Sequence, residues 1–442
     1  MNVRIKQTAY GLLPGAAAAL LGLAGGSAWA QGADATTAAS PLEPSPYYVG
    51  LSQGFTYDSN VYSVPSGPGD SYSTTSLLGG FDQRLGRQRV FGNANVGVNR
   101  YRDQTQLDNT SYRAAGGLDW ETLHDLSGNL GVALSRQLVP PGVTNSVPEQ
   151  ASNIGQTQSV NASARWGGPS LLTLEATLGY SKVDYSAPAY VASESRAETA
   201  SLATYYRPGG PLRLGLAARI VDTRSPQAFF DPVNGTYQSN SVKSNNLDFL
   251  VDYDVSGLLT TNARLSYTKQ TNSASNAADF SGLTGSLSLT WKATGKTSLT
   301  LDAARNAGLQ ATPFTRYSVV PDASGSLQTI ATTGQYQNSQ LTDSAGLRLT
   351  YSATAKIDAF AGARYARDRI ASTIVDASGN LAAPDTIDAQ STAFIGANYA
   401  VVRNWSLACN LSHGHRSVSG GAVAYAYNDN TVGCSARYDL RL

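Results

Sequence analysis

The sequence has few of the residues that build metal centres, nucleic-acid interfaces and membrane helices. It contains one Met, three His and two Cys, and 14% of its 442 residues are charged. So few imidazoles and thiols argue against a metal site with several ligands, and we expect neither a metal nor a cofactor. The low charge argues against a coiled coil, a highly charged disordered chain and a nucleic-acid partner. No long apolar run follows residue 30, which excludes a helical membrane protein.

The first thirty residues have the layout of a secretory signal peptide. Arg4 and Lys6 precede an apolar stretch that runs from Gly11 to Gly26, and an Ala-x-Ala site ends at Ala30. We expect cleavage after Ala30; the alternative is a short membrane anchor. Residues 31–46 are small, polar and rich in Pro, which indicates a flexible periplasmic tail. Without Arg4 and Lys6 the charge is near zero, which argues against a strongly anionic partner held by bulk electrostatics.

From Tyr47 onward, apolar and polar residues alternate along segments of strand length. One segment is typical, because its apolar members recur at every second position: Leu172, Leu174, Ala176, Leu178 and Tyr180. A period of two predicts strands with one apolar face and one polar face, and no helical period competes with it. The body of the chain is therefore predicted to be all-β.

The connections between these segments alternate between short and long. The short ones are Leu85–Gln88, Thr122–Asp125, Gly167–Pro169, Pro208–Pro211, Ser256–Leu258, Ala293–Lys296, Ala353–Lys356 and Val402–Asn404. The longer ones include Leu138–Gly155, Ser225–Lys243, Ala311–Asn338, Ile370–Ile387 and Gly414–Ala424. Together they join about 18 antiparallel strands into an up-and-down transmembrane barrel over residues 47–442, with short periplasmic turns and longer external loops. A sheet can span lipid only when it closes on itself, because lipid offers no hydrogen-bond partners.

Aromatic residues fall on the apolar face near both ends of the predicted strands. Those beside the short turns are Trp120, Trp166, Trp291, Trp405, Tyr206, Tyr351 and Tyr399. Those at the other strand ends are Tyr57, Tyr112, Tyr180, Tyr267 and Tyr365. Two aromatic girdles are typical of a barrel in the outer membrane of a Gram-negative bacterium, in contact with its lipid. The final strand agrees, since alternate residues from Val432 to Leu442 are mostly apolar.

The opposite face of the strands is predicted to line the lumen. By parity it carries Arg113, Asp119, Glu121, Arg165, Glu175, Arg213, Arg219, Asp248, Asp252, Arg264, Lys292, Asp302, Arg348, Asp358, Arg364, Arg437, Asp439 and Arg441. These charges could form cross-strand ion pairs that stiffen the wall, or create the field of a hydrated channel, or both. Inward aromatic residues look sparse and scattered: Tyr101, Tyr205, Phe360 and Phe394. The loops Ser225–Lys243 and Ala311–Asn338 are long enough to fold inward, although they could equally be surface loops.

Two smaller groups of residues remain. Cys409 and Cys434 fall on the outward face of the last two strands, in a register that pairs Trp405 with Tyr438, so a disulfide between them is geometrically possible. Two unbonded thiols in neighbouring strands are the alternative. His413 and His415 stand near serine residues, but only proximity in sequence supports a hydrolase triad, and we expect no enzyme.

The stretch Tyr57 to Tyr62 (Tyr-Asp-Ser-Asn-Val-Tyr), directly after the first predicted strand, resembles the opening of the beta-barrel porin 2 family. The strand pattern of the mature chain is also similar, including Tyr112 to Trp120. That family includes outer-membrane proteins of exopolysaccharide operons. The resemblance implies a channel that exports a polysaccharide, with periplasmic polysaccharide-export proteins as partners, and it carries over no catalytic residue. A general diffusion porin for small solutes is the alternative, followed by a surface hydrolase or adhesin.

Overall fold

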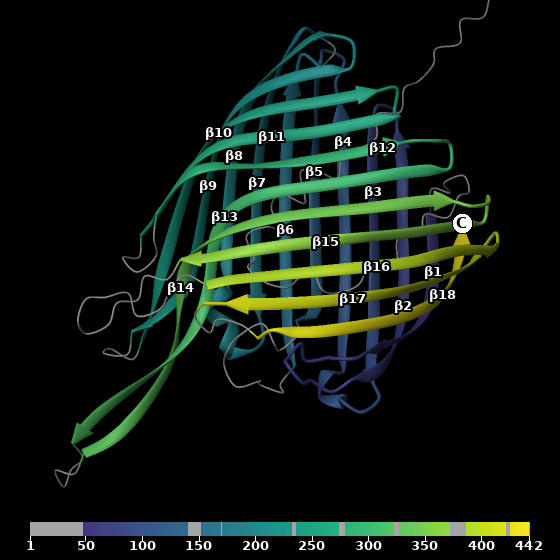
Figure 1. The fold of residues 1–442 in the computed structure, drawn as a ribbon. Helices are drawn as coiled ribbons and strands as arrows, with labels where there is room; N and C mark the ends of the chain where they lie inside the picture. Colours follow the sequence, from purple (N-terminus) through teal and green to yellow (C-terminus); the bar gives the residue numbers. More distant parts are fainter. Residues whose placement is uncertain are drawn as a thin grey trace, which may run out of the picture.

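The computed structural model describes residues 47–139, 152–168, 170–231, 236–273, 279–321, 327–371, 386–420 and 425–441. These residues form one sheet of 18 antiparallel strands, in which each strand pairs with its neighbours in sequence and β1 pairs with β18 (Figure 1). The predicted closed barrel and its number of strands are confirmed. The predicted signal peptide (1–30) and periplasmic tail (31–46) lie outside the described residues.

The first half of the barrel contains β1 (Tyr47–Asp58), β2 (Asp70–Leu85), β3 (Gln88–Tyr101), β4 (Asn109–Glu121), β5 (Leu126–Val139), β6 (Asn153–Trp166), β7 (Leu172–Tyr185), β8 (Ser195–Gly209) and β9 (Leu212–Asp231). The second half contains β10 (Thr236–Val255), β11 (Leu259–Asn272), β12 (Phe280–Lys292), β13 (Thr297–Pro321), β14 (Leu327–Ser352), β15 (Ile357–Ala371), β16 (Thr386–Val402), β17 (Trp405–Ser419) and β18 (Tyr427–Arg441). Two short 3-10 helices, η3 (Thr105–Leu107) and η5 (Pro188–Ser193), lie in connections.

Closure satisfies the backbone of the first and last strands. The β1–β18 ladder runs from Tyr48 opposite Arg441 to Asp58 opposite Thr431. Neither strand therefore leaves an unpaired edge facing lipid. Among the described helices, none combines the length and the apolar character needed to cross a bilayer.

All eight predicted short connections lie between consecutive strands at one end of the barrel, as expected. Among the described residues, four of these turns contain a glycine with positive φ, and two of them illustrate the reason. Gly86 has φ +65° and Gly257 has φ +68°, and only a residue without a Cβ adopts these values at little cost. The chain reverses within a few residues at this end, which marks it as the periplasmic end.

At the other end, two predicted loops are strands. The expectation of loops over Ser225–Lys243 and Ala311–Asn338 is wrong, because β9 pairs with β10 up to Asp231 and β13 pairs with β14 up to Pro321. The predicted loop at 414–424 also begins late, since β17 continues to Ser419. Beyond the membrane both faces of a strand meet water, so the apolar alternation that reveals strands is lost. Figure 1 shows β13 and β14 running on together past the neighbouring strands.

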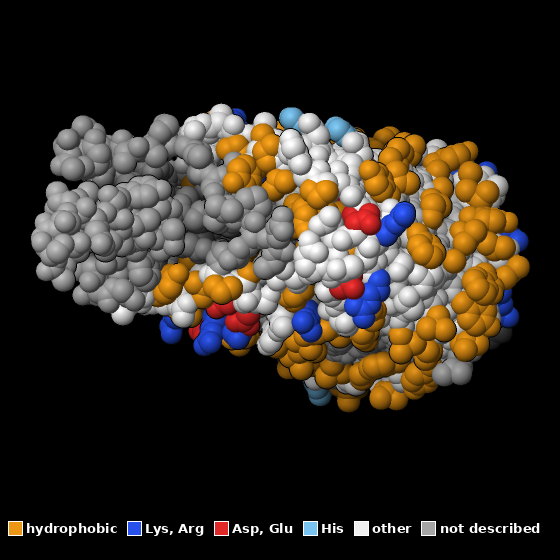
Figure 2. All heavy atoms as spheres, turned by 90° about the horizontal axis from the view of Figure 1, so that it is seen from below, with side chains coloured by type: hydrophobic (Ala, Val, Ile, Leu, Met, Phe, Trp, Pro, Cys, Tyr) orange, Lys and Arg blue, Asp and Glu red, His pale blue; other side chains and the backbone are white. Residues whose placement is uncertain are grey.

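Side-chain burial in the barrel is the reverse of that in a water-soluble protein. Large apolar side chains are exposed along the outward face, among them Leu202 at 61% and Leu216 at 60%. Inward polar side chains such as Asp248, Ser266 and Gln270 are buried. In Figure 2 hydrophobic side chains cover much of the surface, and charged side chains are few among them. Most of the predicted girdle residues are exposed on the same face, as Trp166 and Trp291 illustrate, whereas Tyr112 and Trp120 are half-buried. This face is a lipid-contacting band.

Candidate functional site: the inner wall of the barrel

The inner wall carries the charged residues that parity predicts. Along each strand the predicted lumen residues alternate with outward apolar ones. On β9, for example, Arg213 and Arg219 point inward, and the alternate residues between them, Leu214, Leu216 and Ala218, point outward. The side chain of Arg441 lies outside the described set. The strand register brings several of the predicted residues together in pairs, while others stand apart.

Among the described residues, five ion pairs shorter than 3.5 Å involve predicted residues, either across strands or along one strand. They are Arg165–Glu175 (2.6 Å), Arg213–Asp252 (2.7 Å), Arg219–Asp248 (2.8 Å), Arg89–Asp119 (3.4 Å) and Arg437–Asp439 (2.8 Å). Sequence reasoning missed Arg89, which also binds Asp82 at 2.5 Å. It also missed the pair Arg416–Asp388, in which both side chains are almost fully buried. The expected wall of paired charges is therefore present.

The other predicted lumen residues are dispersed. Arg113 lies opposite Asn95, and Glu121 lies near the exposed turn residue Arg87 at 3.8 Å. Asp302 accepts a hydrogen bond from the Ser288 hydroxyl at 2.7 Å. Arg264 lies opposite Ser286, Lys292 opposite Ser298 and Asp358 opposite Asn398.

Inward aromatic rings are more numerous and more ordered than the sequence suggested. Each of five rings lies against a glycine on the neighbouring strand, so that a Cβ there would approach the ring within 2.4–2.7 Å. The pairs are Tyr48 with Gly80, Phe91 with Gly117, Tyr205 with Gly215, Phe394 with Gly362 and Phe360 with Gly396. A ring that covers a glycine lies along the wall instead of projecting into the lumen.

An arginine guanidinium faces each of these rings. The distances to the ring centroids are 3.8 Å for Arg213 over Tyr205, 4.4 Å for Arg348 over Phe360, 4.8 Å for Arg89 over Phe91, 5.8 Å for Arg364 over Phe394 and 6.0 Å for Arg437 over Tyr48. Such contacts hold the guanidinium by cation–π attraction. We call these five rings and their arginines the arginine–aromatic belt.

The belt lies in the periplasmic half of the barrel. Tyr48, Phe91 and Phe360 are among the first four residues of strands that begin at this end, and Tyr205 lies four residues before the end of β8. The interpretation of scattered inward rings is therefore corrected. The alternation of inward and outward positions along β1 and β3 is enough to place Tyr48 and Phe91 on the inner wall. Which glycine each ring covers depends on the register between neighbouring strands, and the sequence alone does not give that register.

At the loop end, η5 lies on the inward side. Tyr190 and Ala187 pack against Tyr185 and Val139, which share the inward parity of β7 and β5. The strands β9, β13 and β14 lie close to η5 as well. These elements narrow the external mouth. The rings of Tyr72 and Tyr101 stack at 4.8 Å at the loop end of β2 and β3, whereas the sequence had suggested an external loop for Tyr72.

A second loop cluster packs at the same end of the barrel, against Tyr101 of β3. Val61 and Tyr62 are buried with Leu107, Leu138 and Ile154, and the last two continue the outward parity of β5 and β6. The Tyr62 hydroxyl donates to the Gln104 side-chain oxygen at 2.6 Å. Burial raises the pKa of this phenol above its usual value.

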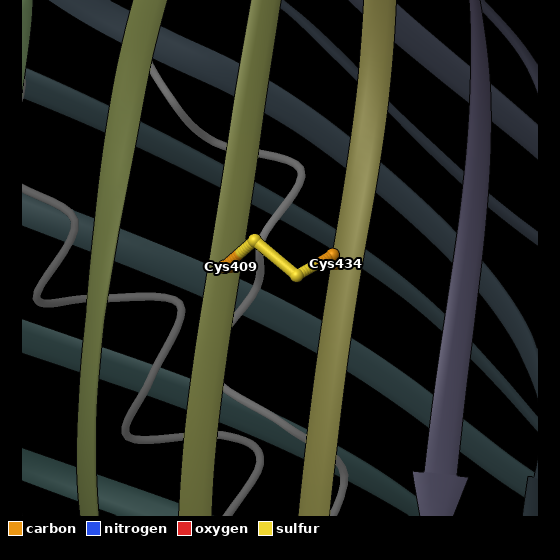
Figure 3. Close-up of a disulfide and its surroundings, with 2 residues drawn as sticks. All are labelled: Cys409 and Cys434. Carbon is orange, nitrogen blue, oxygen red and sulfur yellow. A yellow bond between two sulfur atoms is a disulfide. The ribbon is translucent and has the colours of Figure 1, made fainter.

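The two cysteines form a disulfide between β17 and β18, with Cα atoms 4.1 Å apart (Figure 3). The predicted register is confirmed, because Cys409 lies opposite Cys434 and Trp405 opposite Tyr438.

The imidazole of His413 bonds to the Asn430 side chain at 2.8 Å, and His415 bonds to Asn428 in the same way at 2.7 Å. A hydrolase triad needs a histidine that bonds to a nucleophilic serine, and neither of these contacts involves a serine.

Comparison with known proteins gives likenesses in structure alone. No family model matches the chain, and no curated protein matches its sequence. The FrpB iron transporter of Neisseria meningitidis is 11% identical, with a TM-score of 0.46 over 92% of this chain and 83% of that one. The siderophore receptor PirA of Acinetobacter baumannii is 9% identical, with a TM-score of 0.43 over 90% and 81%.

A similar likeness links the chain to the outer-membrane protein OpdK of Pseudomonas aeruginosa. The two are 12% identical, with a TM-score of 0.41 over 89% of this chain and 98% of that one. The closed sheet, the exposed apolar band and the aromatic girdles are features of this chain itself. The protein is thus a transmembrane β-barrel of the Gram-negative outer membrane, with a polar inner wall.

Proposed function

We propose that this barrel conducts an exopolysaccharide outward across the outer membrane. The observation that carries the proposal is the inner wall in its periplasmic half, where the aromatic rings lie over glycines and the charges are largely paired. A hydrated polymer meets a polar surface there, without rings that project into its path. Eighteen strands enclose a lumen wider than side chains can fill, which leaves room for water and polymer.

Transport through such a barrel is passive. Paired charges along the wall exchange hydrogen bonds with water and sugar hydroxyls, so these paired positions hold the polymer only loosely. The energy for export then comes from periplasmic polysaccharide-export proteins, the partners that the resemblance to the beta-barrel porin 2 family implies. The mouth narrowed by η5 would serve as the gate.

The test is polymer secretion. The gene is deleted in the native host, and polysaccharide is quantified in the medium and in the periplasm. We expect lost secretion with periplasmic accumulation, and recovery when the intact gene is restored. Unchanged secretion in the deletion strain would contradict the proposal.

The inward position of η5 favours a second function, a general diffusion porin for small solutes. An inward-folded segment is a common way to set the size limit of a porin. Liposome swelling distinguishes the two, because a diffusion porin admits mono- and disaccharides at rates that fall steeply with solute size. A barrel dedicated to export would stay closed to them until its periplasmic partners engage it.

A further inference from the structure

One sector of the arginine–aromatic belt differs from the rest. Over β14, β15 and β16, the guanidiniums of Arg348 and Arg364 flank a single ring, at 5.9 Å and 5.8 Å from the centroid of Phe394. Arg348 also stacks on Phe360 at 4.4 Å. The sector therefore concentrates two positive charges on neighbouring strands of the inner wall.

Elsewhere in the belt each arginine has a carboxylate partner. Arg89 binds Asp82 and Asp119, Arg213 binds Asp252, and Arg437 binds Asp439. Within the described part of the chain, neither Arg348 nor Arg364 forms an ion pair. Two like charges that face one ring repel each other, and in this sector no protein anion relieves the repulsion.

The neighbouring carboxylates form no ion pair with either arginine in the part of the chain that the structure describes. Asp302, on β13, lies opposite Gly346 and accepts a hydrogen bond from Ser288. Asp343 lies on the outward face of β14, where it binds Arg305 and Arg369. Asp358 lies opposite Ser352 and Asn398, nearer the periplasmic turn. The positive charge of the sector is thus available to a ligand in the lumen.

Burial in the sector suits a binding site. Phe360 and Phe394 are 7% and 8% exposed, whereas Arg364 is exposed and Arg348 is half-buried. The rings form a fixed base, and the guanidiniums on it keep N–H donors free. Gly346 leaves space beneath Arg364, whose Cγ would lie 3.6 Å from a Cβ at that position.

We propose that Arg348 and Arg364 bind the carboxylate of an acidic sugar unit in the transported polymer. The planar guanidinium offers paired N–H donors that match the two oxygens of a carboxylate, and two arginines fixed on rings lose little freedom on binding. This inference rests on the proposed function and specifies its substrate class: a polysaccharide with uronic acid units. The attraction is local, which agrees with the near-zero charge of the barrel as a whole.

The test is isothermal titration calorimetry on the purified full-length barrel in detergent. The probes are tetragalacturonate, which is acidic, and maltotetraose, which is neutral and of equal length. The test variant is Arg348→Gln/Arg364→Gln. The control variant Arg87→Gln/Lys356→Gln removes the same charge from turns at the same end of the barrel, outside the lumen.

We expect the native barrel and the control to bind tetragalacturonate at least about tenfold more tightly than maltotetraose, and the test variant to lose this preference. The variant Arg348→Lys/Arg364→Lys keeps the charge and should retain part of it. Circular dichroism confirms that each variant is folded.

Equal binding by the native barrel and the test variant would overturn the inference. So would inorganic phosphate that binds as tightly as tetragalacturonate, since the site would then recognise any small anion. Calorimetry and polymer secretion are separate measurements, so the binding site and the export function can fail independently.

Discussion

Arginine in this barrel is stabilised in two different ways. In the belt it stacks on a ring and stays partly accessible, whereas at the loop end Arg416 is enclosed with Asp388. The side chain of Arg416 is 1% exposed and that of Asp388 is 4% exposed, and two hydrogen bonds join them. Removal of one partner from such a pair leaves the other charge buried without compensation.

We predict that Arg416→Leu lowers the free energy of unfolding by about 3–5 kcal/mol. The double variant Asp388→Asn/Arg416→Gln should recover part of the loss, because both charges of the pair are removed together. Arg87→Gln, at an exposed turn, is the control and should cost at most about 1 kcal/mol. Urea unfolding in detergent micelles gives the values. Equal stability of Arg416→Leu and Arg87→Gln would contradict the enclosed pair.

Strands in this protein are readable from sequence only where the two faces meet different surroundings. Within the lipid band the alternation of β7 located the strand and its inward Glu175 correctly. In the outer part of β14, residues such as Thr332, Thr333 and Gln335 give no alternation, and the strand was missed. Parity placed Arg348 and Arg364 on the inner wall. That neither has a carboxylate partner among the described residues follows from the register of three strands, which a single sequence does not specify.

The hairpin of β13 and β14 extends beyond the barrel wall. Past Arg305, β13 has no pairing with β12, and from Pro313 to Gln335 the two strands pair only with each other. We predict that replacing residues 313–335 with Asn-Gly, between the opposed Thr312 and Tyr336, leaves the barrel folded, with an unfolding free energy within about 1 kcal/mol of the native value. Circular dichroism and urea unfolding measure the effect, and a barrel that fails to fold would show that the hairpin belongs to its core.

At the scale of the whole molecule, the apolar side chains of this barrel are surrounded by lipid, whereas those of a water-soluble protein are surrounded by its own core. Leu202 lies midway between the two girdles on the outward face, and Thr177 points inward at nearly the same depth on β7. We predict that Leu202→Arg destabilises the barrel in lipid vesicles by about 2–4 kcal/mol, whereas Thr177→Arg has a much smaller effect because it meets polar neighbours. Denaturant titration in vesicles compares them. Similar effects would contradict the assigned faces.

The passage of polymer through the lumen is tested most directly by crosslinking in secreting cells. A photo-reactive amino acid is placed either at Thr177, on the inner wall, or at Leu178, the next residue and outward-facing. The account predicts that light attaches polysaccharide covalently to the barrel with the label at position 177 and not at 178. Cells that secrete polymer normally, yet give no attachment at 177 or equal attachment at both positions, would contradict it.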